Sequence, residues 1–393
     1  MDPEISDEQP AGIGRADELG HDLAAPVADK RADPREAGNA KKLTIVRVER
    51  IADRIAILLR SPIPEAQPES RGQVHRTFRR QRQFALKPTQ GIMRARKYPA
   101  VAGVVMSKEG LDVVRRAFAR EIMATAGIED TRVEAAFAAV RREHFLGPGP
   151  WQIVSWFGGY VPTPSGDPVY LYTDHVVGIL PERNLNNGEP SLHARLMPSA
   201  ALQEGEHVVH VGAGVGYYTA ILATLVGPGG AVTAIEFDSG LAARAAANFA
   251  QWPNVRVIQG DGGQAPFDPA DVIYVNASAT RPAPFWLDGL KEGGRLILPL
   301  TTYHGFPSSE RGEIHPRGAV FRIERRGSEF LARWLLGVVT FPCEGARDAA
   351  SELALSAAFA TERWREVTRL YRRDDLPADQ CWLRAPGWCL AYR

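Results

Sequence analysis

The amino-acid sequence predicts an α/β protein with an open, mostly parallel β-sheet and helices on both faces. Three observations support this class. An apolar run over residues 208–211 meets a glycine-rich turn, a second apolar run over 231–235 follows a helix-like segment, and further short apolar runs recur at similar spacing. Strands that alternate with helical segments in this way are typical of βαβ units.

The glycine-rich turn is the most informative element. Residues 208–219 read Val-Val-His-Val-Gly-Ala-Gly-Val-Gly-Tyr-Tyr-Thr, and Glu236 ends the next apolar run. Glycines let the backbone pass close to a ligand, and an acid at this position accepts hydrogen bonds from ribose hydroxyls. Many tight turns carry glycines and bind nothing, so the loop alone is a weak signal. Its G-x-G-x-G order departs from the G-x-G-x-x-G of pyrophosphate sites, which favours a cofactor without a pyrophosphate, such as S-adenosylmethionine.

Three later segments continue the alternating pattern. Residues 255–262 predict a strand that ends in Gly-Asp-Gly, 271–278 predict a fourth buried strand and a polar loop, and 290–299 predict a helix end, a glycine turn and a fifth strand. Ligands on such sheets bind outside the carboxyl ends of the strands. We therefore expect Asp261 to lie near an adenine amino group, and Asn276 and Ser278 to lie where cofactor and substrate meet.

The region from residue 111 to residue 300 resembles the protein-L-isoaspartate O-methyltransferase family. The segment 212–219 resembles the family's "GtGsGYqTA" motif, and Tyr217 and Thr219 match it. Other matching segments are 140–145 ("VPRexF"), 260–262 ("GDG"), 265–268 ("aPFD") and 293–296 ("GGRL"). After the core, the strand-like segments 319–323, 330–334 and 339–342 resemble the antiparallel strands that complete the family's sheet.

The resemblance implies a Rossmann-like sheet that binds S-adenosylmethionine and transfers its methyl group to a peptide or protein carboxylate. A carboxylate is ionised near neutral pH, so no general base is required. The resemblance and the strand edges together give twelve candidate cofactor contacts: Gly212, Ala213, Gly214, Gly216, Tyr217, Thr219, Glu236, Phe237, Asp261, Gly262, Asn276 and Ser278.

The substrate loop departs from the family pattern. The family's "tISqPyivA" aligns with residues 186–194, which read Asn-Asn-Gly-Glu-Pro-Ser-Leu-His-Ala, and Gly188 falls at the serine that is associated with placing the substrate carboxylate. Ser191 is one possible replacement. The candidate substrate residues are Asp174, Asn187, Gly188 and Ser191. A capping role for Asp174 is as well supported as a role in the pocket, and His210, at the position of an acid in the family, is expected to be structural.

Three functions therefore stay open. The first is a carboxyl methyltransferase that acts on isoaspartyl or related peptides. The second is a methyltransferase of the same fold that acts on another peptide or a small molecule, which the glycine at position 188 favours. The third is a non-catalytic, cofactor-binding protein that keeps the fold for partner recognition.

Composition is consistent with an enzyme. The chain has 393 residues, 45% of them hydrophobic, a net charge of +1 and three cysteines. The cysteines have no metal-ligand spacing, so we expect no metal site. The charge gives no reason to expect nucleic acid, no run is long enough to span a membrane, and no signal peptide is recognisable, so a cytoplasmic location is the expectation.

We expect three regions: an N-terminal extension (1–105), a methyltransferase domain (106–345) and a helical, Trp-rich extension (346–393). Residues 1–40 carry ten Asp and Glu against four Lys and Arg and are expected to be disordered. Residues 41–61 predict a strand or an amphipathic helix. Residues 71–97 carry nine Lys and Arg and no acid, and a solvated basic linker is favoured over a phosphate-binding segment. Residues 349–371 are expected to be helical, and the Trp-rich end is expected to dock as a strand.

Overall fold

A computed structural model of the protein describes residues 107–155, 159–302, 318–338 and 345–393. These residues all belong to one compact unit that spans Phe84–Arg393. The expectations for residues 1–105, including the acidic, apolar and basic segments there, and for the late strand at 339–342 lie outside the described residues.

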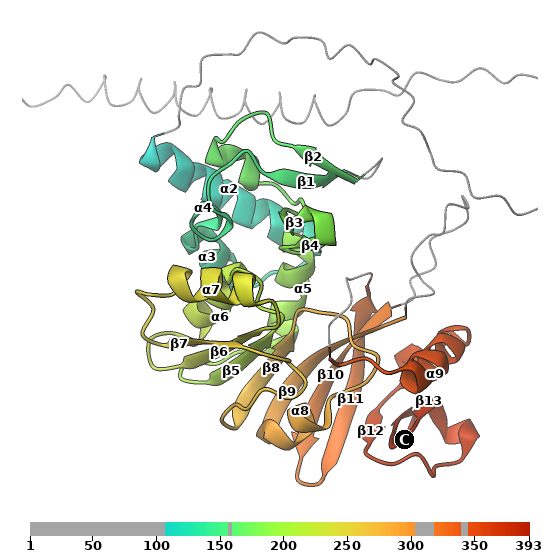
Figure 1. Ribbon diagram of the computed structural model, residues 1–393. Helices are drawn as coiled ribbons and strands as arrows, with labels where there is room; N and C mark the ends of the chain where they lie inside the picture. Colours follow the sequence, from blue (N-terminus) through green and yellow to red (C-terminus); the bar gives the residue numbers. More distant parts are fainter. Residues whose placement is uncertain (1–106, 156–158, 303–317, 339–344) are drawn as a thin grey trace, which may run out of the picture. The chain divides into compact units, whose positions relative to one another are not determined.

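The described residues contain a ten-stranded mixed sheet (Figure 1). Five of its strands are parallel, and they lie side by side in the spatial order β7-β6-β5-β8-β9. The chain moves outward from β5 in one direction and then returns to add β8 on its other side, so a topological switch point lies between β5 and β8. The bounds are β5 (His207–Val211), β6 (Ala231–Glu236), β7 (Val255–Gln259), β8 (Ala270–Val275) and β9 (Leu290–Thr301).

The other half of the sheet is antiparallel and comes from the carboxyl-terminal part of the chain. Its spatial order continues from β9 as β10-β11-β12-β14-β13, so the sheet runs on past residue 345 into the predicted C-terminal extension. The expected strands at 319–323 and 330–334 and the docking of the Trp-rich end are confirmed. The bounds are β10 (Gly318–Arg326), β11 (Glu329–Gly337), β12 (Arg369–Tyr371), β13 (Cys381–Ala385) and β14 (Trp388–Ala391).

The expectation of a helix over 349–371 is wrong beyond its first half. Helix α9 (Ala349–Phe359) ends early, Glu362 adopts a left-handed φ of 53°, and a 3-10 turn, η4 (Trp364–Glu366), leads into β12. Leu370 of β12 pairs with Phe330 of β11. Without β12, the backbone N–H and C=O groups at the edge of β11 would be unpaired. The hydrogen bonds that β12 makes with them stabilise the strand more than a longer helix would be stabilised.

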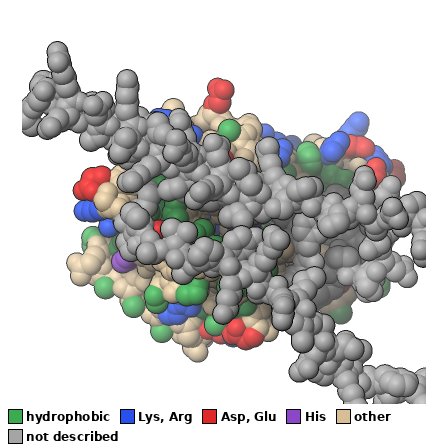
Figure 2. All heavy atoms as spheres, turned by 90° about the horizontal axis from the view of Figure 1, so that it is seen from above, with side chains coloured by type: hydrophobic (Ala, Val, Ile, Leu, Met, Phe, Trp, Pro, Cys, Tyr) green, Lys and Arg blue, Asp and Glu red, His purple; other side chains and the backbone are tan. Residues whose placement is uncertain are grey.

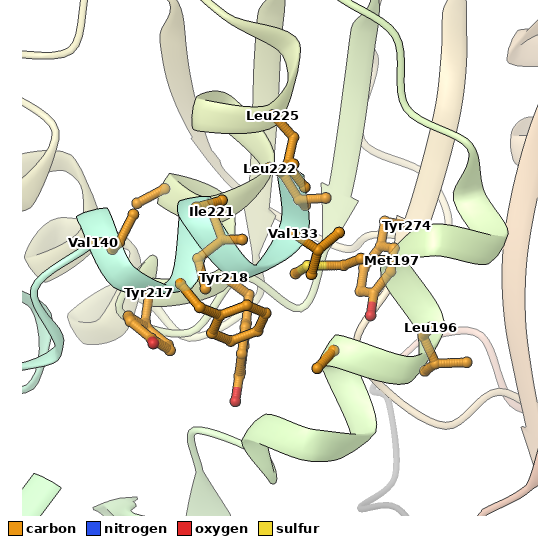
Figure 3. Packing of buried hydrophobic residues seen from close by; sticks show 14 of the residues in the cluster. Val133, Val140, Leu196, Met197, Tyr217, Tyr218, Ile221, Leu222, Leu225 and Tyr274 are labelled. Atoms are coloured by element: carbon orange, nitrogen blue, oxygen red, sulfur yellow. The ribbon is translucent and has the colours of Figure 1, made fainter. Parts of the chain in front are cut away.

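Helices cover both faces of the sheet, as predicted. Side chains along β8 alternate: Val272 and Tyr274 join one hydrophobic cluster, while Ile273 and Val275 join the other. Figure 3 shows part of the first cluster, where side chains of α3, α5 and α6 meet Tyr274. The helices of the first cluster are α2 (Lys108–Ala126), α3 (Thr131–Ala139), α4 (Arg142–Leu146), α5 (Pro190–Ala200), α6 (Tyr217–Val226) and α7 (Ser239–Asn248), and those of the second are α8 (Pro284–Gly289) and α9.

Short elements connect α4 to α5. They comprise two hairpins, β1 (Gln152–Ser155) with β2 (Gly159–Pro162) and β3 (Gly178–Leu180) with β4 (Leu185–Asn186), and the 3-10 turns η1 (Pro168–Leu171) and η2 (Pro181–Arg183). A further 3-10 turn, η5 (Ala378–Gln380), precedes β13. Strand β4 leads directly into the loop before α5, which is the segment that resembles the family's substrate loop.

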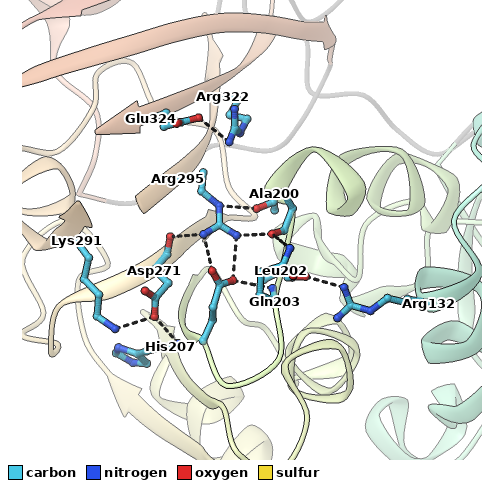
Figure 4. A network of polar contacts seen from close by, with 12 residues as sticks. Arg132, Ala200, Leu202, Gln203, His207, Asp271, Lys291, Arg295, Arg322 and Glu324 are labelled. Atoms are coloured by element: carbon cyan, nitrogen blue, oxygen red, sulfur yellow. Dashed lines mark hydrogen bonds and ion pairs between the residues drawn. The ribbon is translucent and has the colours of Figure 1, made fainter. Parts of the chain in front are cut away.

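Arg295 of β9 joins the sheet to the end of α5 (Figure 4). Its guanidinium is largely buried, donates to the backbone oxygens of Ala200 and Ala201 at 2.9 and 2.5 Å, and forms a bidentate ion pair with Glu206 at 2.7 and 2.9 Å. The last carbonyls of a helix lack partners within the helix. Arg295 supplies donors to these carbonyls, and so holds the helix that follows the substrate loop in place.

The surface carries charges of both signs. On the part of the face in Figure 2 that shows described residues, basic and acidic side chains are interspersed with hydrophobic ones. None of the described helices combines the length and apolar character that crossing a bilayer requires.

Candidate functional site

A cavity of about 640 Å³ lies at the switch point of the sheet. This volume is within the range of about 300–1,000 Å³ that ligand pockets occupy. Its walls come from the glycine loop after β5, the ends of β6 and β8, and the segment from Asp174 to the start of α5. Ten of the predicted site residues line it: Asp174, Asn187, Gly188, Gly212, Ala213, Gly214, Glu236, Phe237, Gly262 and Asn276.

The glycine loop closes tightly on its neighbours. Gly212 has a φ of 75°, and a Cβ there would lie 3.2 Å from the Asn276 backbone oxygen. The amides of Gly212 and Ala213 donate to the Ile235 oxygen at 2.9 and 3.1 Å, and the Gly214 amide donates to Glu236 Oε2 at 2.7 Å. A pyrophosphate site directs such amides at the ligand. Here three of them are used within the protein, which agrees with a cofactor that has no pyrophosphate.

Glu236 joins the loop to the end of β6. Its Oε2 accepts the Gly214 amide, its Oε1 accepts the Asp238 amide at 3.0 Å, and only 8% of the residue is exposed. Burial raises the pKa of Glu236 above its ordinary value, and the two backbone hydrogen bonds oppose that rise. Each carboxylate oxygen has a second lone pair, so the group can still accept two hydroxyl donors. The neighbouring Phe237 ring is 48% exposed at the cavity wall.

Three of the predicted contacts lie below the loop rather than on the cavity. A Cβ at Gly216 would lie 2.4 Å from the Phe249 ring, while Tyr217 and Thr219 are fully buried. Figure 3 shows Tyr217 and Tyr218 within the first hydrophobic cluster. Helix α6 is buried along nearly all its length, so its first turn points side chains into the core. The prediction that Gly216, Tyr217 and Thr219 contact the cofactor is not supported by this placement.

Asp261, Ser278 and Ser191 are also absent from the cavity lining. The Asp261 carboxylate turns back to accept the Gly263 amide at 2.8 Å and the Gln264 side-chain amide at 2.7 Å. Ser278 is fully buried, and its backbone oxygen accepts from Arg347. The carboxylate that we expected near adenine is used in hydrogen bonds within its own turn. Gly262, the next residue, lines the cavity instead.

Asp174 performs both of the roles that the sequence left open. Its Oδ1 accepts the Ser191 amide at 2.8 Å and so caps the first turn of α5, and the residue also lines the cavity. Ser191 itself is buried and does not line the cavity. The structure therefore does not support Ser191 as a replacement for the family's serine.

His210 has the structural surroundings that the sequence favoured. It is fully buried, its Nδ1 lies 2.8 Å from Thr219 Oγ1, and its ring packs against the Tyr274 ring. Burial lowers its pKa to about 3, so the ring is neutral at physiological pH.

Comparisons with known proteins agree with this geometry. The family model described as protein-L-isoaspartate(D-aspartate) O-methyltransferase matches residues 158–308. A protein-L-isoaspartate O-methyltransferase of Ignicoccus hospitalis is 32% identical over 212 residues, which cover 53% of this chain and 92% of that protein. The chain belongs to the protein-L-isoaspartate O-methyltransferase family.

Other members of the family match over less of their length. The protein-L-isoaspartate O-methyltransferase of Thermotoga maritima is 31% identical over 185 residues. The aligned part is 46% of this chain and 53% of that protein. A solved protein-L-isoaspartate O-methyltransferase superposes with a TM-score of 0.48 and 26% identity, over 59% of this chain and 66% of that one.

One positioning residue of this family member was missed as a site residue. Arg142, within the segment that resembles "VPRexF", is fully buried between the Phe118 and Tyr217 rings. It donates to the Leu171 and Thr173 oxygens at 2.5 and 3.0 Å and to the His175 oxygen at 3.4 Å. These carbonyls flank Asp174, so Arg142 fixes the backbone that presents Asp174 to the cavity. An arginine inside a family motif was the available signal.

The position of the family's serine is occupied differently in this chain. Gly188 has a φ of 69°, its amide donates to Asn186 Oδ1 at 2.9 Å, and its oxygen accepts the Tyr218 hydroxyl at 3.2 Å. A Cβ there would lie 2.7 Å from His193 Nε2. The backbone conformation favours glycine, and His193 takes the space that a serine side chain would need.

Proposed function

We propose that this chain binds S-adenosylmethionine in the cavity and transfers a methyl group to a carboxylate of an isoaspartyl-type peptide or protein. The observation that carries the proposal is the common cavity. Gly212, Gly214 and Glu236 line one wall at the switch point of the sheet, and the loop that resembles the family's substrate loop, with Asn187 and Gly188, lines another.

The cavity residues fit the proposed cofactor. Glu236 has lone pairs for two ribose hydroxyls, and the exposed Phe237 ring offers a flat apolar surface for a base. The acidic residues Asp174 and Glu189 also line the cavity. Burial, followed by the charge of Asp174, raises the pKa of Glu189. Negative charge on this wall favours a ligand with a sulfonium and an ammonium group.

The chain's own contribution is orientation and desolvation. S-adenosylmethionine, when bound, supplies an electrophilic methyl group on a sulfonium. The loop 186–189 then places the substrate carboxylate, and the cavity walls exclude water from it. An ionised carboxylate is itself the nucleophile, so the protein has no proton to remove.

Replacing Glu236 with alanine is expected to weaken S-adenosylmethionine binding by about 1–3 kcal/mol, because two hydrogen bonds to a charged acceptor are lost. Calorimetric titration of both proteins measures the difference. Glu204→Ala, at an exposed glutamate outside the cavity, is the control. Unchanged affinity in Glu236→Ala would remove the ribose role.

Cofactor affinity is expected to fall in acid. Ribose hydroxyls donate to the ionised carboxylate, whereas burial raises the pKa of Glu236 in the free protein. Affinity should therefore be complete above this raised pKa and decrease as the pH falls through it. Titrations across a pH series give the profile, and Glu236→Gln should bind more weakly and lose this acid limb. An acid limb that persists in Glu236→Gln would point to another group.

The decisive experiment measures transfer of labelled methyl from S-adenosylmethionine to an isoaspartyl peptide, with the aspartyl peptide as control. Selective, base-labile labelling of the isoaspartyl peptide supports the proposal. Labelling of another substrate alone would favour the second candidate, a methyltransferase of the same fold with a different substrate. Gly188 at the position of the family's serine supports this candidate. Cofactor binding without any transfer would favour a binding protein.

We also propose a reducing, cytoplasmic location. The support is that Cys381 and Cys389 lie on paired strands, are buried and remain free thiols. Burial, followed by the neighbouring Cys381, raises the pKa of Cys389, which disfavours the reactive thiolate. Thiol trapping of protein purified without reductant would test this, since a Cys381–Cys389 disulfide would contradict it.

A further inference from the structure

Two buried N–H groups flank Gly188 in the cavity wall. Within the described residues, neither Asn187 Nδ2 nor His193 Nε2 has a hydrogen-bond partner, although Asn187 is only 4% exposed and His193 only 2%. Both residues line the cavity. A buried donor without a partner costs about 1–3 kcal/mol, so a ligand atom that accepts from it recovers that energy.

The two residues stand where the family pattern is apolar. In "tISqPyivA" the positions that align with Asn187 and His193 are I and v, and the position that aligns with Gly188 is the serine. In this chain the serine position is therefore a glycine, and polar side chains stand instead at positions 187 and 193. His193 Nε2 lies 2.7 Å from the point that a Cβ at position 188 would occupy.

The surroundings of His193 fix its ring and its tautomer. The ring stacks on Tyr218 with centroids 3.6 Å apart, and Nδ1 lies 2.9 Å from the Tyr274 hydroxyl. That hydroxyl is fully buried and has no other hydrogen-bond partner among the described residues. Donation of this hydrogen to Nδ1 leaves the imidazole proton on Nε2, and a ligand acceptor at Nε2 then satisfies both hydrogens. In this tautomer Nε2 is a donor beside Gly188.

We propose that Asn187 Nδ2 and His193 Nε2 together replace the family's loop serine as the donors that hold the substrate carboxylate. The inference rests on the proposed function and names its substrate-positioning groups. One carboxylate oxygen accepts from this pair, and the other oxygen is left free to attack the methyl group. The oxygen–methyl bond forms as the sulfur–methyl bond breaks, and the sulfur keeps the electron pair.

Neutral donors suit this reaction. Burial lowers the pKa of His193 to about 3, so the ring carries no charge at physiological pH. A cationic partner would stabilise the ionised carboxylate more than the transition state, in which its negative charge is being lost. Neutral N–H groups orient the carboxylate with less of this penalty.

A matched pair of variants tests the histidine. In His193→Gln the side-chain amide nitrogen reaches the place of Nε2, whereas in His193→Asn it reaches only the place of Nδ1. We expect His193→Asn to raise KM for the isoaspartyl peptide about 10- to 100-fold with a smaller change in kcat, and His193→Gln to stay within about threefold. Asn187→Ile should behave as His193→Asn does.

Binding and spectroscopy give readouts that a structural role would not move. The isoaspartyl peptide is titrated into each protein saturated with S-adenosylhomocysteine, and thermal unfolding confirms that all variants fold. Nitrogen-15 NMR of labelled histidine reports which ring nitrogen of His193 carries the proton, and peptide binding should shift Nε2 and not Nδ1.

Each outcome bears on the inference. Equal affinity and KM in all folded variants, or a proton on Nδ1, overturns the role of the donor pair while the proposed function stands on the wild-type activity. If the unaltered chain shows neither peptide binding nor methyl transfer, the proposed function is overturned, and the role of the donor pair is overturned with it.

Discussion

Replacing Arg142 with methionine is expected to lower the free energy of unfolding by about 3–5 kcal/mol. The substitution keeps the volume between the Phe118 and Tyr217 rings but removes the donors to three backbone oxygens. Each buried carbonyl that loses a donor costs about 1–3 kcal/mol, and the cation–π contacts are lost as well. No local group can replace a guanidinium that bridges residues 171, 173 and 175.

The same variant is expected to bind cofactor and substrate more weakly, because Asp174 lies within the segment that Arg142 holds. Urea unfolding followed by circular dichroism measures the stability, and calorimetry at a temperature where the variant is folded measures the binding. The neighbouring Arg141→Met, at an exposed position, is the control and should change stability by less than about 0.5 kcal/mol. Similar losses in the two variants would contradict the role of Arg142.

Replacing Arg295 with methionine is expected to cost about 2–4 kcal/mol. The largely buried guanidinium satisfies the last carbonyls of α5 and pairs with both oxygens of Glu206. Its removal leaves the Ala200 and Ala201 oxygens without this donor and the half-buried carboxylate of Glu206 without its cation. The expected cost exceeds that of a surface ion pair, which is about 0–1 kcal/mol.

A double-mutant cycle separates the ion pair from the helix contacts. The cycle compares Arg295→Met, Glu206→Gln and the double variant. The double variant should lose less stability than the sum of the two single losses, because no unpaired charge is then left at position 206. Lys291→Met removes an exposed ion pair with Asp271 and serves as the control. An Arg295→Met cost no larger than that of Lys291→Met would show that Arg295 does not hold α5.

The parallel half of the sheet could be predicted because its signals are local. Apolar runs such as 208–211 and 231–235, separated by glycine turns, define strand and helix within a few residues of each other. The C-terminal segment could not be predicted in the same way. Apolar spacing over 349–371 suits a helix, but Leu370 lies on a strand because the edge of β11, far away in the sequence, supplies its pairing partner.

The candidate site divides along the same line. Gly212, Gly214 and Glu236 are placed by the backbone at strand ends, so motif spacing was enough to bring them to the cavity. Tyr217 and Thr219 share the glycine motif, and Asp261 and Ser278 also follow strand ends. Their side chains nevertheless point into the core or back into a turn. Motif spacing determines where a Cα lies, whereas local packing decides where the side chain points.

From the sequence alone followed the alternation of strands and helices that builds the parallel sheet, the glycine loop facing an acid at one edge, and the loss of the family's serine at Gly188. Only the tertiary structure placed His193 against Gly188 and Tyr274, and Arg142 against the segment around Asp174. The His193–Tyr274 and Arg142–Leu171 contacts join residues that lie 81 and 29 positions apart in the chain. Periodicity and spacing describe neighbours in sequence, and such long-range contacts depend on how whole elements pack, which no local pattern specifies.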